Sequence, residues 1–251
     1  MPVSIKSERE IELMRESCRR LAILHEELAE LIRPGISTAQ INDAGEKIIR
    51  DFGCIPSFRN YQGYPASICV SVNEEIVHGI PKKDRILREG DIVSLDAGMI
   101  YRGYHSDAAR THAVGQITPE AQALIDGAEE CFRQGVAMAK AGNHLHDISN
   151  AIADCAAAHG FGVIQELCGH GIGTELHEPP QIPNHRQTTR GIRLRPGMTL
   201  AVEPMICLGD RHVRRLADHW TFVTADGSYA AHYENTILIT EDEPEILTLR
   251  R

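Results

Sequence analysis

The sequence predicts an α/β (α+β) protein that consists of two similar αβ halves related by a pseudo-twofold axis. The chain has 251 residues, of which 42% are hydrophobic and 24% charged, values that are usual for a globular protein with a sizeable core. Some segments carry apolar residues at helical spacing, and others are strand-like apolar runs. A set of residues also recurs at an offset of 107 positions, which indicates an internal duplication.

The first helix is predicted from Ser7, which together with Glu10 forms a capping-box pattern. Pro34-Gly35 is expected to end it. The apolar stripe along this helix consists of Ile11, Met14, Cys18, Leu21, Leu28 and Leu31.

Three more helices follow from the same reasoning. Thr38 is expected to cap a helix that reaches about Asp51 and is closed by Gly53. The other two helices are predicted over residues 119–139 and 145–159. An aromatic-containing loop is predicted over residues 54–67, and strands are predicted over residues 67–77, 91–100, 104–114, 199–206, 221–224, 233–240 and 245–249.

When the sequence is aligned with itself, strand-like segments that contain a carboxylate match one another. At the offset of 107, Asp96 falls on Glu203. Further on, His105-x-Asp107 resembles His232-x-Glu234 at a larger offset, which requires an insertion in the second half. The matched pairs are Gly35 with Gly142, Ile41 with Ile148, Ala44 with Ala151, Gly53 with Gly160, and Leu87-Arg88-x-Gly90 with Leu194-Arg195-x-Gly197. Coincidence between segments of like secondary structure remains the alternative.

Charge and composition exclude several function classes. The formal net charge of −9 leaves no basic excess for neutralising phosphates, so we expect no nucleic acid as a main partner. No apolar run approaches the length of a membrane span, and the N-terminal segment lacks the core of a signal peptide. The seven cysteines form no CxxC pair, which argues against a structural zinc knuckle. Because a secretion signal is lacking, we expect reduced thiols in the cytoplasm.

Four carboxylates in strand-like segments are the main chemical signal. Asp96, Asp107, Glu203 and Glu234 lie in or beside apolar runs, where an unpaired buried charge would be very unfavourable. Each one alone could be an exposed acid at a strand end. Two pairs at equivalent places instead suggest a site for two divalent cations. His170, between two glycines, could complete the ligand set.

These residues lie in motifs that resemble those of one family, type I methionine aminopeptidase, over essentially the whole chain. The motifs are VNEEIVHGIP, GDIVSLDAG, YHSDAART, GHGIG-x-x-x-HE, LRPGMTLAVEPM, the segment around Trp220, and YENTILIT. The resemblance implies the pita-bread fold, with a central antiparallel sheet and helices outside. It also implies a single catalytic domain over residues 1–251, with halves at roughly 35–115 and 142–240.

The resemblance implies a complete site. Its metal ligands would be Asp96, Asp107, His170, Glu203 and Glu234. These would hold two divalent ions, with Co, Mn, Fe(II), Zn or Ni as the candidates. His78, His177 and Glu203 would be catalytic, and His78 and His177 would also contact the substrate. The methionine pocket would consist of Phe58, Tyr61, Tyr64, Cys69, Leu176 and Trp220.

The expected reaction is removal of the N-terminal methionine from nascent proteins when the second residue is small. Hydroxide activated by the two metals would attack the first peptide bond. Phe58 and Leu176 depart from the commonest family residues, cysteine and phenylalanine, and HEPP replaces HEEP after His177. Without the resemblance, the aromatic residues and Cys69 could be plain core, and the two catalytic histidines plain turn residues.

Two other functions stay open at this point. One is a proline dipeptidase on the same scaffold, which normally needs a further N-terminal domain. The other is a non-catalytic module associated with ribosomes or RNA, which should lack ligands or carry basic surface. We expect a cytoplasmic enzyme with no membrane partner. One chain would contain the whole site, so a monomer suffices, and ribosome contact is compatible with the function but has no signature here.

Overall fold

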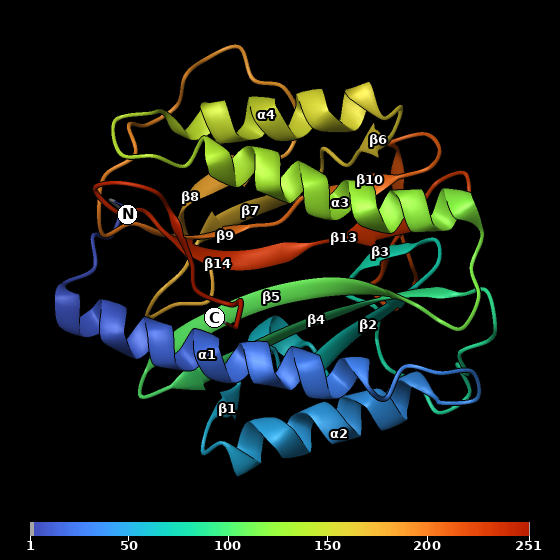
Figure 1. The fold of residues 1–251 in the computed structure, drawn as a ribbon. Helices are drawn as coiled ribbons and strands as arrows, with labels where there is room; N and C mark the ends of the chain where they lie inside the picture. Colours follow the sequence, from blue (N-terminus) through green and yellow to red (C-terminus); the bar gives the residue numbers. More distant parts are fainter. Residues whose placement is uncertain (1–2, 251) are drawn as a thin grey trace.

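A nine-stranded sheet forms the centre of the molecule, with the four helices α1–α4 packed against it (Figure 1). This computed structural model describes residues 3–250, so residues 1, 2 and 251 of the expected domain lie outside the described residues. The helices are α1 (Glu8–Ala29), α2 (Thr38–Asp51), α3 (Pro119–Ala137) and α4 (Leu145–Ala158), with a short 3-10 helix, η1, at Tyr61–Gly63. None of the helices in this range is both long and apolar enough to cross a bilayer.

The main path of the sheet is β1-β4-β5-β14-β9-β7-β8, with β2 beside β4 and β15 beside β14. All pairings in it are antiparallel. Its strands are β1 (Ile55–Pro56), β2 (Ile68–Val72), β4 (Ile92–Tyr101), β5 (Tyr104–Ala113), β7 (Cys168–Gly171), β8 (Glu178–Pro183), β9 (Thr199–Val202), β14 (Glu234–Leu238) and β15 (Glu245–Ile246). Two three-stranded sheets consist of β6 (Gly162–Val163), β10 (Met205–Cys207) and β13 (Ala230–His232), and of β3 (Glu75–Val77), β11 (Val213–Arg215) and β12 (Phe222–Thr224).

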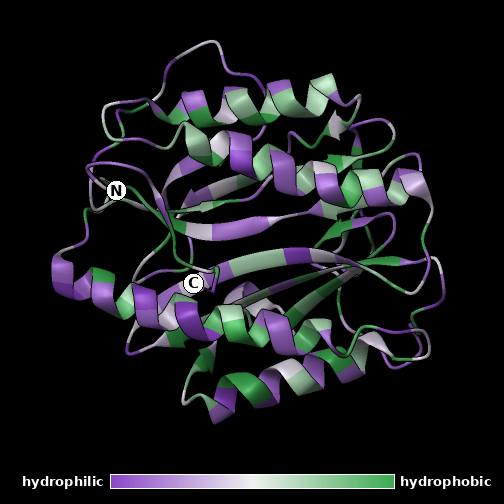
Figure 2. Cartoon of the chain, in the orientation of Figure 1, coloured by the Kyte–Doolittle hydropathy of each residue, from purple (hydrophilic) through white to green (hydrophobic). Residues whose placement is uncertain are grey.

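All four predicted helices are confirmed, with corrections at their ends. The capping box at Ser7 and Glu10 is present, but α1 stops at Ala29, before the proline. The N-cap of α2 is Ser37 rather than the expected Thr38, because the Ser37 hydroxyl accepts a hydrogen bond from an amide in the first turn. Hydrophobic and hydrophilic residues are interspersed along each helix (Figure 2), as expected when one side of a helix packs against a sheet and the other faces solvent.

The predicted strands are present, but several short ones were not expected. The run predicted over residues 199–206 is two strands, β9 and β10, because the chain leaves the main sheet at Glu203-Pro204. Strands β7 and β8 lie in a segment where no strand was predicted, and the short strands β1, β6, β11 and β13 were also missed. Segments this short carry too few residues for an alternating pattern to be recognised.

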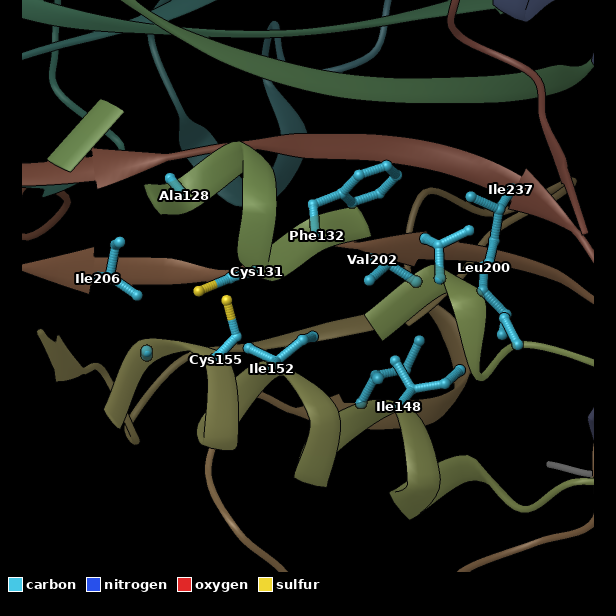
Figure 3. Packing of buried hydrophobic residues seen from close by; sticks show 14 of the residues in the cluster. Ala128, Cys131, Phe132, Ile148, Ile152, Cys155, Leu200, Val202, Ile206 and Ile237 are labelled. Carbon is cyan, nitrogen blue, oxygen red and sulfur yellow. The ribbon is translucent and has the colours of Figure 1, made fainter. Parts of the chain in front are cut away.

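The two faces of the sheet have different roles. On β4, Val93, Leu95 and Ala97 belong to the apolar core under α1 and α2. Because successive side chains of a strand point to opposite faces, Ser94 and Asp96 point away from these helices. A second core, under α3 and α4, includes Phe132, Ile148, Ile152, Leu200 and Ile237 (Figure 3). The helices therefore cover one face, and on β4 the opposite face carries the polar side chains of Ser94 and Asp96.

The two halves repeat in backbone detail. Helices α2 and α4 both have 14 residues and begin 107 positions apart. The amide of Gly35 donates to the carbonyl of Leu87 over 2.8 Å, and the amide of Gly142 donates to that of Leu194 over 3.1 Å. Isolated bridges join Ser37 to Ile86 and His144 to Arg193. On this basis we propose that residues 35–115 and 142–240 are the repeats of one domain.

Candidate metal centre and active site

Five neighbouring strands each contribute one of the predicted ligands. In the order of the sheet, Asp96 lies on β4, Asp107 on β5, Glu234 on β14, Glu203 directly after β9, and His170 on β7. Strands β5 and β14 lie side by side where the two halves meet (Figure 1). The site therefore requires both halves of the chain.

Register places the three ligands of the β4-β5-β14 region on one face. Asp96 and Glu234 are both paired with Ala109 of β5, from opposite sides. Directly opposed residues on neighbouring strands point to the same face of a sheet. Residues two apart along a strand also share a face, so Asp107 lies on the same face as Ala109, Asp96 and Glu234. The methyl side chain of Ala109 leaves the space between the carboxylates open.

The β9 and β7 ligands reach the same face by similar pairing. His170 is paired with Ala201, two residues before Glu203. Strands β14 and β9 pair antiparallel, and Asn235 lies opposite Val202. The next pair in this register is Glu234 and Glu203, which are therefore neighbours at the end of the paired region. Gly169 is required here, since a Cβ atom on it would lie 2.4 Å from the carbonyl oxygen of Ala201.

The resulting cluster is tight and buried. The Nε2 atom of His170 lies 3.8 Å from an oxygen of Asp107 and 3.5 Å from an oxygen of Glu203. The Nε2 atom of His232 lies 3.7 Å from the other oxygen of Glu203 and 3.8 Å from an oxygen of Glu234. Such separations are too long for hydrogen bonds.

Burial sets the protonation of this cluster. Loss of hydration raises the pKa of Asp96 to about 7, and burial together with neighbouring carboxylates raises the pKa values of Asp107, Glu203 and Glu234 well above their usual range. Burial also lowers the pKa of His170 to about 3, which keeps its imidazole neutral. Four acids with raised pKa values and a neutral imidazole are the electrostatic pattern of a cation site.

The side chains fit divalent metal ions. Asp96 Oδ1, Asp107 Oδ1 and Glu234 Oε1 are buried without a hydrogen-bond partner. Two atoms that ligate one ion at about 2.1 Å are about 3.0 Å apart at a right angle and about 4.2 Å apart across the ion, a range that includes the nitrogen–oxygen distances above. The Nδ1 atom of His170 is 2.9 Å from the carbonyl oxygen of Gly171. Donation of its proton there leaves the Nε2 lone pair free to bind a metal.

One cavity contains all the predicted site residues. Its volume is about 160 Å³, several times the ~30 Å³ share of one liquid water. It is lined by the five predicted ligands, by His78 and His177, by the six predicted pocket residues, and by Gln62, which the sequence reasoning did not single out. The cavity therefore joins a carboxylate floor to a largely apolar wall.

The apolar wall has a packed support. Phe58, Tyr64, Cys69 and Leu176 belong to one buried cluster, against which Tyr61 and Trp220 pack. The rings of Tyr64 and Trp220 meet edge to face, with centroids 5.1 Å apart. These residues are thus both part of the core and lining of the cavity, so the two alternatives weighed for them from the sequence are compatible.

The two predicted catalytic histidines lie at the rim between floor and wall. The imidazole centroids of His177 and His170 are 4.2 Å apart, and Nδ1 of His177 lies 2.7 Å from the Tyr61 hydroxyl. His78 has a positive φ of 58° and packs edge-on against Trp220. Burial lowers the pKa of His78 to about 4, so it is neutral at physiological pH.

His232 is a site residue that the sequence reasoning left without a role. Burial lowers the pKa of His232 to about 3, and its side chain is 2% exposed. The signal was available, because the comparison of the two halves had already set His232-x-Glu234 beside His105-x-Asp107.

Comparison with known proteins decides the family. The model of metallopeptidase family M24 matches residues 12–241. The chain belongs to metallopeptidase family M24. Within this family it is 47% identical to a methionine aminopeptidase of Clostridium acetobutylicum, over 98% of this chain and 99% of that one. The crystal structure of a methionine aminopeptidase from Thermotoga maritima has a TM-score of 0.97 at 42% identity, covering 99% of this chain and 100% of that chain.

The M24 scaffold is shared with prolidases, and the comparison separates the two groups. A prolidase from Pyrococcus furiosus has a TM-score of 0.80 at 24% identity; the match covers 98% of this chain but 66% of that one. That likeness shows the fold alone. The pita-bread fold of the methionine aminopeptidases is confirmed for this chain, as is membership of a metal-dependent peptidase family.

Proposed function

We propose that this protein is a methionine aminopeptidase, which uses two divalent metal ions to hydrolyse the first peptide bond of chains that begin with methionine. The observation that carries the proposal is one cavity that is lined both by the five candidate metal ligands and by a largely apolar wall. Full-length similarity to methionine aminopeptidases supports it. The substrates would be nascent proteins in the cytoplasm, and the enzyme would act as a monomer because one chain supplies every site residue.

The metal centre would be held by Asp96, Asp107, His170, Glu203 and Glu234. Bound divalent ions supply Lewis acidity, which polarises the scissile carbonyl and acidifies a water molecule near neutral pH. A set of four carboxylates and an imidazole suits Mn, Fe(II) or Co, and also accepts Ni and Zn.

Glu203 is the proposed proton carrier. Its side chain lines the cavity. It is 13% exposed, more than the side chains of Asp107 and Glu234, the other carboxylates near His170 and His232. A carboxyl group there can accept a proton from the attacking water and deliver it to the leaving amine.

His177 and His78 would orient the substrate. His177 lies beside His170, so it can hydrogen-bond the developing oxyanion or the scissile amide next to the ligand cluster. His78, which packs between Trp220 and Phe222, would position the substrate or the leaving peptide. Donors held in place before the reaction contribute about 3–4 kcal/mol each to transition-state stabilisation.

Substrate selection would come from two regions of the cavity. Phe58, Tyr61, Tyr64, Cys69, Leu176 and Trp220 would surround the methionine side chain. Apolar contact alone discriminates weakly between hydrophobic residues of similar size. Preference for a small second residue would come from crowding beyond the scissile bond, and cleavage of Met-Ala-Ser should exceed that of Met-Phe-Ser.

The test is an assay of purified protein on Met-Ala-Ser with added Mn or Co. Wild type should release methionine, and His170→Ala and Glu203→Gln should each nearly abolish turnover without unfolding the protein. The matched controls, His212→Ala and Glu166→Gln, alter exposed residues outside the cavity and should retain turnover. Absence of turnover with any divalent metal would favour a binding protein, and rapid cleavage of X-Pro dipeptides instead would favour a prolidase.

A further inference from the structure

His232 is held rigidly beside the ligand cluster by its own backbone. Its amide donates to the Thr111 hydroxyl over 3.0 Å, and that hydroxyl donates to the His232 carbonyl over 2.9 Å. Strand β13 also pairs His232 with Met205, two residues after Glu203. The imidazole is therefore fixed between the ends of β9 and β14.

The imidazole has no polar partner at hydrogen-bond distance. The side chain is only 2% exposed, so water does not reach it, yet neither of its ring nitrogens makes a hydrogen bond. Buried polar atoms in native proteins are almost always satisfied, so such a pair needs an explanation. Nε2 faces oxygens of Glu203 and Glu234 at 3.7 and 3.8 Å, like the distances of 3.5 and 3.8 Å that His170 makes.

The described residues contain two groups with ligand atoms close enough to share an ion. One group is Asp107, His170 and Glu234, and the other is Asp96, His232 and Glu234. Within each group the ligand atoms lie within 4.8 Å of one another. Glu234 is common to both groups, and each group has an imidazole of its own.

We propose that His232 is a sixth protein ligand of the metal centre and binds, through Nε2, the ion held by Asp96 and Glu234. This inference rests on the proposed function, because it requires that the cluster binds metal. Coordination would satisfy the buried Nε2. It would also give both ions a nitrogen ligand, which favours transition metals over Mg²⁺.

The equivalent residue of the first half behaves differently, which shows that the role is specific to His232. His105 occupies the matching position before Asp107, but its Nδ1 is 2.9 Å from the Ser57 hydroxyl. It has a polar partner and is in neither ligand group. The duplication therefore supplies the residue twice, and of the two only His232 belongs to a ligand group among the described residues.

A direct test is proton NMR of the protein loaded with Co(II), in which the N–H protons of metal-bound imidazoles are shifted far from the normal range. The wild type should show two such exchangeable signals, from His170 and His232, and His232→Gln should show one. A wild type with one signal that disappears in His170→Ala overturns the proposal for His232. A wild type that binds no Co(II) contradicts the proposed function itself. The number of signals in the wild type is measured without any variant, so it tests the proposal even if His232→Gln folds poorly.

Calorimetric titration with Co(II) gives the second readout. His232→Gln should weaken binding of one ion at least tenfold and leave the other nearly unchanged. The matched control is His112→Gln, since His112 is another largely buried histidine with an unpartnered Nε2 but belongs to neither ligand group. Equal binding of both ions by His232→Gln and the wild type would overturn the proposal.

Discussion

The Tyr61 hydroxyl and the Nδ1 atom of His177 lie 2.7 Å apart, and this hydrogen bond joins the methionine-pocket wall to a proposed catalytic residue. A phenol that donates to Nδ1 leaves the imidazole proton on Nε2. The rings of the two residues are also in contact, with centroids 5.2 Å apart. Tyr61 therefore orients His177, and as the donor it would also set the tautomer in which His177 can donate a hydrogen bond to the substrate.

Removal of this hydroxyl should slow the reaction more than it weakens binding. Tyr61→Phe keeps the ring in the pocket and loses a hydrogen bond of about 1 kcal/mol, which corresponds to roughly a fivefold lower kcat. KM for Met-Ala-Ser should change little. Tyr101→Phe, on a tyrosine outside the cavity, is the control, and an unchanged kcat in Tyr61→Phe would contradict this role.

The raised pKa of Asp96 predicts how the metal-free protein responds to pH. Burial raises this pKa from 3.8 to about 7, so the folded state binds more protons than the unfolded state between these values. The contribution of Asp96 to stability is present below about pH 4 and is lost as pH rises towards 7. Asp96→Asn imitates the protonated form and should escape this loss.

Thermal melting with a chelator present measures the difference. The two proteins should melt at similar temperatures near pH 4, and Asp96→Asn should melt increasingly above wild type as pH approaches 7. Asp242→Asn removes an exposed carboxylate and should follow wild type throughout. Parallel curves for wild type and Asp96→Asn would show that the Asp96 carboxyl is not destabilised by burial.

Gly98 controls the position of Phe58 in the pocket. A Cβ atom on Gly98 would lie 2.9 Å from the Phe58 ring and 3.0 Å from the Ser106 carbonyl oxygen. Gly98→Ala should therefore push Phe58 into the cavity and raise KM for methionine peptides severalfold. The double variant Gly98→Ala/Phe58→Leu should recover part of the loss, and absence of any KM effect would contradict the link.

The core under α3 and α4 should govern stability without touching the chemistry. Phe132 is 1% exposed and packs in this core (Figure 3), so Phe132→Ala should lower the free energy of unfolding by about 3–5 kcal/mol. Urea unfolding measures this change, and kcat of the folded fraction should stay at the wild-type value. Leu208→Ala, at an exposed position, should alter stability by less than about 0.5 kcal/mol.

Local signals in the sequence predict most of the fold, and they fail where a contact is made over a distance. The capping box at Ser7 and the end of the second helix at Asp51 are local, and the structure reproduces them. The break between β9 and β10 is different, because Pro204 ends a strand that leaves one sheet and joins another. Pro204, which cannot donate a backbone hydrogen bond, is a local signal of the break, but the change of sheet depends on partner strands far along the chain.

The site shows the same division. The five predicted ligands lie in recognisable motifs, and the structure brings them into one cavity. His232 could be noticed through the internal repeat, but its role could not be predicted. Its equivalent His105 bonds Ser57, and only the pairing of β13 with β10 places His232 beside the carboxylates. Position in a repeat identifies a residue, whereas its surroundings decide its chemistry.

The most direct measurement is anomalous diffraction from crystals of the wild-type protein loaded with manganese. Two peaks are expected in the cavity, both within about 2.0–2.5 Å of a Glu234 oxygen. One peak should also be ligated by Asp107 and His170, and the other by Asp96. Crystals soaked at saturating manganese that show no peak among these residues, or show their side chains turned away from a common centre, would contradict the account.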